Sequence, residues 1–153
     1  MALLEINNLV KHFPISTGFF GRKTGDVKAV DGVSLSVEDG ETLGLVGESG
    51  CGKSTLGRCL LRLIEPTSGE IVFEGEEITA MNFERMREMR RKMQIIFQDP
   101  YASLNPRMRV GEIIGEGLQI HGLATGADLK DHVMGLLEKV GLREEQYDRY
   151  PHE

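Results

Sequence analysis

One short glycine-rich stretch constrains the possible folds of this chain more than any other feature. Residues 47–55 have the sequence GESGCGKST, which matches the phosphate-binding loop pattern G-x-x-x-x-G-K-[S/T] at every fixed position. Glycine allows the backbone to turn with positive φ and to bring N–H groups close to phosphate oxygens. The pattern therefore predicts a triphosphate-holding loop between a strand and a helix.

The polar residues of this loop have separate predicted roles. Lys53 is expected to reach the β- and γ-phosphates, and the Ser54 hydroxyl is expected to ligate Mg²⁺. The N-terminus of the following helix would face the same anion. The alternative, a plain turn between a strand and a helix, requires neither side chain. The residues predicted to hold the nucleotide in this loop are Gly47, Glu48, Ser49, Gly50, Cys51, Gly52, Lys53, Ser54 and Thr55.

The flanking segments fit this setting. Residues 42–46 predict a buried strand that leads into the loop, after a tight turn at Asp39 and Gly40. Residues 53–64 predict a helix with Leu56, Leu60 and Leu63 on one face. Elsewhere the pattern predicts strands at 3–10, 33–37, 71–73 and 93–97, helices at 83–92, 110–120 and 128–140, and connections at 16–26 and 99–106. This order predicts an α/β fold in which an antiparallel β-subdomain precedes a phosphate-loop core and a helical segment.

Composition excludes several function classes. The 153 residues suit one globular domain, and the net charge of −6 argues against general affinity for nucleic acid or anionic lipid. No apolar run approaches the length of a membrane span, and the first residues lack the basic region of a secretory signal. Cys51 and Cys59 have no metal-ligand spacing, and two free thiols suit a reducing compartment.

Three motifs together resemble ATP-binding cassette (ABC) ATPases. Residues 41–55 resemble the Walker A region of that family, and residues 9–13, LVKHF, resemble its adenine-stacking loop, with Phe13 at the aromatic position. Residues 93–100, MQIIFQDP, resemble the Q-loop of the family. The resemblance implies that Gln98 ligates Mg²⁺ or a water bound to Mg²⁺. It also implies that Gln98 is a second catalytic residue beside Lys53. The alternatives are that Phe13 is a core residue and that Gln98 merely opens a loop.

Longer blocks resemble the ATPases of peptide importers. The first block is residues 98–108. The second consists of residues 12–15 and 27–34, which are separated by a long insertion, and the third is YPHE at residues 150–153. The resemblance implies one ABC ATP-binding domain over 1–153, divided into a β-subdomain at 1–46, a phosphate-loop core at 47–98 and a helical subdomain at 99–153. It also implies ATP and Mg²⁺ as cofactors, and peptides, glutathione or nickel as possible solutes.

The resemblance also implies partners and a location. Transmembrane permease subunits and a second ATPase subunit are expected partners, with an extracytoplasmic solute-binding protein acting indirectly and no nucleic acid. The expected location is cytoplasmic, peripheral on the inner face of the cell membrane.

Some motifs of the family are absent from the sequence. It contains no signature motif, no Walker B aspartate with its neighbouring glutamate, and no switch histidine. We therefore expect an N-terminal part of such an ATPase, which binds ATP without hydrolysing it. The strand at 42–46 would then have an unpaired apolar edge, which favours self-association. Three alternatives stay open: an ABC ATPase with a non-transport role, a phosphate-loop kinase of small molecules, and a pure nucleotide-binding module.

Overall fold

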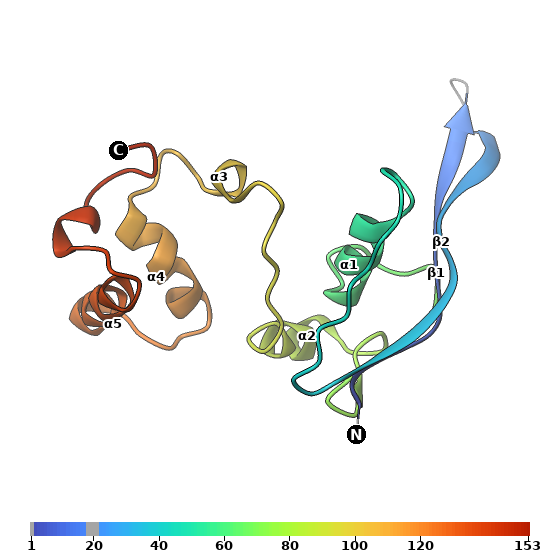
Figure 1. Ribbon diagram of the computed structural model, residues 1–153, viewed down its shortest axis with the longest axis horizontal. Helices are drawn as coiled ribbons and strands as arrows, with labels where there is room; N and C mark the ends of the chain where they lie inside the picture. Colours follow the sequence, from blue (N-terminus) through green and yellow to red (C-terminus); the bar gives the residue numbers. More distant parts are fainter. Residues whose placement is uncertain (1, 18–21) are drawn as a thin grey trace. The chain divides into compact units, whose positions relative to one another are not determined.

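The computed structural model describes residues 2–17 and 22–153 as two compact units, Met1–Met93 and Gln94–Glu153 (Figure 1). The first unit contains the sheet and the phosphate loop, and the second is helical. Each unit has its own apolar core.

The first unit is built on an antiparallel sheet. Its strands are β1 (Ala2–Thr17), β2 (Arg22–Glu38), β3 (Ser68–Phe73) and β4 (Glu76–Glu77), in the spatial order β2-β1-β3-β4. Alternate residues of a strand point to one face, and this places Ile6 of β1 opposite Ile71 of β3 in the buried layer. The alternation at 33–37 correctly predicted part of β2.

Two helices complete the core of this unit. Helix α1 (Lys53–Leu60) contributes Leu56 and Cys59, and helix α2 (Phe83–Met89) contributes Met86 and Met89. The Asn82 side chain caps α2 by accepting the Arg85 N–H at 2.8 Å. Each large apolar side chain buried in this way stabilises the fold by about 2 kcal/mol. The buried residues of this core are Ile6, Leu9, Val30, Leu56, Cys59, Ile71, Phe73, Ile78, Met86 and Met89.

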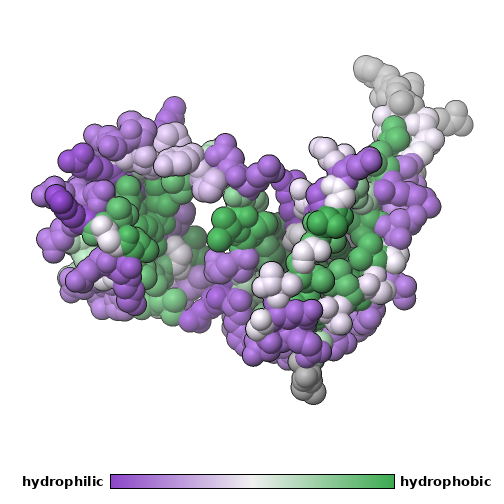
Figure 2. All heavy atoms as spheres, viewed as in Figure 1, coloured by the Kyte–Doolittle hydropathy of each residue, from purple (hydrophilic) through white to green (hydrophobic). Residues whose placement is uncertain are grey.

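Two predicted buried strands are wrong. Residues 42–46 and 93–97 form no strand, and their side chains are largely exposed, to 91% at Val46 and 90% at Ile96. Apolar surface shows along both stretches (Figure 2). A strand needs a neighbour to pair its backbone N–H and C=O groups, and within residues 2–17 and 22–153 the sheet contains only β1 to β4, so neither segment is paired in it. The apolar composition of these segments predicted strands, but composition does not show which other strands would pair with them.

Several element boundaries also differ from the prediction. The connection expected at 16–26 is strand at both ends, and its residues 18–21 lie outside the described part of the chain. Helix α1 ends at Leu60, because Arg62 takes φ +47° and turns the backbone out of the helix. Leu63 is consequently exposed and does not continue the buried face of α1. Helix α2 ends at Met89, three residues earlier than predicted.

The second unit is a small helical cluster. The predicted loop at 99–106 contains helix α3 (Pro100–Ser103), capped by the Asp99 side chain. Helix α4 (Val110–Ile120) has the predicted bounds, and α5 (Gly126–Lys139) starts two residues early. Leu129, Val133 and Leu137 of α5 form the core, and the 3₁₀ turn Glu144–Gln146 follows. Among the described residues, no helix is long and apolar enough to span a membrane.

Candidate nucleotide-binding site

The phosphate loop adopts a conformation that only glycine permits at its two fixed positions. Gly52 has φ +97°, and a Cβ there would lie 2.0 Å from the carbonyl oxygen of Ala29. A Cβ on Gly47 would lie 2.7 Å from the Cys51 sulfur. The contact at Gly52 is with backbone, so any side chain there would displace the loop or β2, whereas a side chain at Gly47 would force the Cys51 thiol to move.

The start of α1 offers donors to an anion. The first hydrogen bond of the helix runs from the Leu56 N–H to the Gly52 carbonyl at 2.8 Å, so the N–H groups of residues 53–55 have no acceptor within the helix. The helix has no acidic residue in its first turn and no side-chain cap. The positive end of its dipole is therefore not neutralised by the chain itself. This donor set fits a phosphate group.

The Lys53 side chain folds over the loop. Its Nζ donates to the carbonyl oxygens of Gly47 and Glu48, each at 2.7 Å, and lies 3.5 Å from the Cys51 Sγ. Phosphate oxygens carry a full charge that peptide carbonyls lack, so they are the stronger acceptors for this ammonium. Lys53 is thus held at the mouth of the loop by bonds that a triphosphate can replace.

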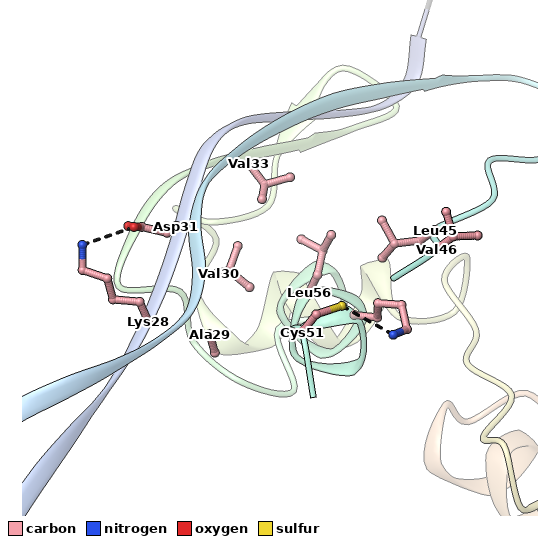
Figure 3. A pocket seen from close by; sticks show the side chains of 11 residues that line it. Lys28, Ala29, Val30, Asp31, Val33, Leu45, Val46, Cys51 and Leu56 are labelled. Carbon is pink, nitrogen blue, oxygen red and sulfur yellow. Dashed lines mark hydrogen bonds and ion pairs between the residues drawn. The ribbon is translucent and has the colours of Figure 1, made fainter. Parts of the chain in front are cut away.

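A bulge in the hairpin brings β2 against the loop. Lys11 pairs with Val30 and His12 pairs with Lys28, so Ala29 is an extra residue without a partner on β1. Its carbonyl is the group that abuts Gly52. Beside this contact lies a cleft of 330 Å³, in which Val30, Val33 and Leu56 point toward one another (Figure 3). The cleft is lined by Lys28, Ala29, Val30, Asp31, Val33, Leu45, Val46, Cys51, Gly52, Lys53 and Leu56.

Charged side chains also surround the bulge, and Figure 3 shows two of them, Lys28 and Asp31, at the edge of the cleft. The Asp31 carboxylate accepts a hydrogen bond from His12 at 3.0 Å and another from Lys28 at 3.2 Å. These two bonds, that of His12 first, hold the pKa of Asp31 below its usual value. The three residues bracket Ala29 on both strands and so help to fix the carbonyl that faces Gly52.

Phe13 lies at the surface of the same hairpin. It pairs with Val27, which is two residues from Ala29, or about 7 Å along β2. Its side chain is 37% exposed, so Phe13 is not a core residue. The hairpin thus brings an accessible aromatic ring to the neighbourhood of the phosphate loop.

The other predicted site residues lie in different places. Ser54 and Thr55 are in the first turn of α1, beside Lys53. Gln98 is exposed and belongs to the second unit, so its approach to the loop and to Mg²⁺ stays a prediction.

The sequence analysis did not single out Lys11, whose Nζ lies 4.9 Å from the centre of the Phe13 ring, or Ala29, whose carbonyl abuts Gly52. The alternation of strand residues, which puts positions 11 and 13 on one face, could have drawn attention to Lys11. Nothing in the local sequence marks Ala29, because its role depends on the register between two strands.

Fold and loop together define a phosphate-loop nucleotide-binding protein. The family model described as ABC transporter matches residues 30–153, so the chain belongs to the ABC transporter family. Its fold is similar to that of the ATP-binding cassette MJ0796, solved as a dimer in a post-hydrolysis state bound to ADP and Pi. That similarity has a TM-score of 0.76 at 22% identity and covers 97% of this chain and 62% of the cassette. The fold is accordingly that of part of an ABC nucleotide-binding domain.

Two groups of relatives are similar in sequence. The oligopeptide transport ATP-binding protein AppF of Bacillus subtilis is 51% identical over 99% of this chain and 46% of its own length. The glutathione import ATP-binding protein GsiA of Salmonella paratyphi A is 52% identical over 99% of this chain and 24% of its own length. The chain thus spans less than half the length of these curated relatives.

Proposed function

We propose that this chain binds ATP with Mg²⁺ at the phosphate loop, as the nucleotide-binding part of an ABC importer ATPase for peptides or related solutes. One observation carries the proposal: the same unit presents unneutralised helix N–H groups, the Lys53 ammonium and an accessible aromatic ring around one loop. The N–H groups and Lys53 suit a triphosphate, and Phe13 suits a base.

Bound Mg²⁺ would neutralise part of the phosphate charge. Ser54 is the residue of the loop whose hydroxyl would ligate the ion, and Gln98 is the proposed second ligand. Lys53 would hold the β- and γ-phosphates. None of these residues is a carboxylate that can polarise an attacking water. We therefore propose that the 153-residue chain binds ATP and turns it over at the background rate.

The importer role is supported by the names of the relatives. AppF is an oligopeptide transport protein and GsiA a glutathione import protein, and both are about half identical to this chain. By extension, we propose that the chain works beside transmembrane permease subunits and a second ATPase subunit, at the inner face of the cell membrane. An extracytoplasmic solute-binding protein would supply the solute.

Calorimetric titration with ATP and Mg²⁺ tests the binding proposal. The unaltered chain should show saturable binding that Lys53→Ala abolishes. Lys139→Ala, which removes a lysine from the end of α5 in the second unit, is the matched control and should bind as the unaltered chain does. Equal binding by the Lys53 and Lys139 variants would contradict the site. Phosphate release above background by the unaltered chain, lost with Lys53→Ala, would contradict the proposed absence of turnover.

A further inference from the structure

Lys11 lies against the ring of Phe13. The two residues are two positions apart in β1, which places their side chains on the same face of the strand. The Lys11 Nζ is 4.9 Å from the centre of the Phe13 ring. The negative face of an aromatic ring attracts a cation at this distance. The ammonium thus lies over one face of the ring, so a stacking partner would use the other face of this 37% exposed side chain.

The Lys11 ammonium also contacts the backbone on the side away from the Phe13 ring. Its Nζ donates a hydrogen bond to the Glu65 carbonyl at 2.8 Å. The same segment is tied to β1 by the backbone, because the Thr67 N–H donates to the Val10 carbonyl at 2.7 Å. The His12 N–H in turn donates to the Thr67 hydroxyl at 3.0 Å. Lys11 is therefore held between the strand that carries Phe13 and the segment that follows the phosphate-loop helix.

We propose that Lys11 is a positioning residue of the nucleotide site, which fixes the Phe13 ring so that its open face stacks on the base of ATP. This inference rests on the proposed function. Lys11 acts through Phe13 and not on the phosphates. A lysine that merely attracted the triphosphate would strengthen the binding of any polyphosphate, whereas a lysine that orients the ring affects only ligands with a base. That difference separates the two roles.

Titrations with ATP and with inorganic tripolyphosphate test the proposal. Lys11→Met keeps the length of the side chain without its charge and should weaken ATP binding by about threefold to fivefold. It should leave the affinity for tripolyphosphate unchanged. Lys11→Arg restores a cation over the ring and should recover most of the affinity for ATP. Lys92→Met is the matched control, since Lys92 follows α2 in the same unit and contacts Glu74 instead of the ring; it should leave both affinities unchanged.

The chain contains no tryptophan, so Phe13→Trp introduces a single fluorescent reporter at the ring position. The emission maximum of this tryptophan should differ between Phe13→Trp and the double variant that also carries Lys11→Met, because the indole loses its neighbouring cation. The difference should be present with and without nucleotide. Identical spectra would overturn the contact. Equal weakening of ATP and tripolyphosphate by Lys11→Met, or no weakening of either, would overturn the positioning role. Absence of saturable ATP binding by the unaltered chain would instead overturn the proposed function itself, and this role with it.

Discussion

Strand β3 and the segments 42–46 and 93–97 all contain branched apolar residues, yet only β3 contributes side chains to the core. Ile71 of β3 is 0% exposed and Ile96 is 90% exposed, although both lie in runs of similar composition. The difference lies in their neighbours: β3 pairs with β1 on one side and β4 on the other. Within the described residues, the two exposed segments have no paired strand. Burial here follows from pairing and packing together, and apolar sequence alone does not produce it.

The largest expected effect comes from the same substitution made in both regions. Ile71→Ala opens a cavity between β1, β3 and the helices and should lower the free energy of unfolding by about 3 kcal/mol. Ile96→Ala removes an exposed side chain and should change it by less than about 0.5 kcal/mol. Urea unfolding followed by circular dichroism measures both. If both variants lost a similar free energy of unfolding, residues 93–97 would be packed in solution. That result would contradict the difference in burial between Ile71 and Ile96.

Self-association gives the next largest effect. The exposed apolar segments are available to a second chain, so the unaltered protein should form dimers and larger species at high concentration. Val46→Lys and Ile96→Lys place a charge in each segment and should shift the population toward monomer. Val140→Lys, at another exposed position after α5, is the control and should have little effect. Light scattering distinguishes these cases, and a monodisperse monomer of the unaltered chain would contradict the account.

The smallest effect concerns the hairpin bulge. His12 and Lys28 hold the pKa of Asp31 below its ordinary value in the folded chain. A depressed pKa contributes stability that is present above the unfolded pKa and is lost as pH falls through the folded pKa. The unaltered chain should therefore lose stability more steeply than Asp31→Asn between about pH 5 and about pH 2. Urea midpoints at both ends of this range provide the test, and parallel pH profiles would exclude a contribution from Asp31.

The parts of the fold that the sequence predicted well depend on local interactions. The phosphate loop, the bounds of α4 and the alternating strand at 33–37 follow from glycine positions and from periods that a single segment carries. The exposed state of residues 42–46 and the bulge at Ala29 do not, because both depend on which strands lie side by side. The same holds for the candidate site. A sequence motif was enough to predict Lys53 and Ser54. The three-dimensional structure was needed to find the contact of Ala29 with Gly52 and the position of the Lys11 ammonium over the Phe13 ring.

Hydrogen–deuterium exchange with and without ATP and Mg²⁺ shows whether the hairpin and the loop form one nucleotide site. Saturating nucleotide should slow exchange at residues 47–57 and, in the same titration, at residues 11–14 of β1. Lys53→Ala should abolish both changes. Slower exchange in the loop alone would separate Phe13 from the site. Unchanged exchange in both segments at saturation, or protection confined to the helical unit, would contradict the account.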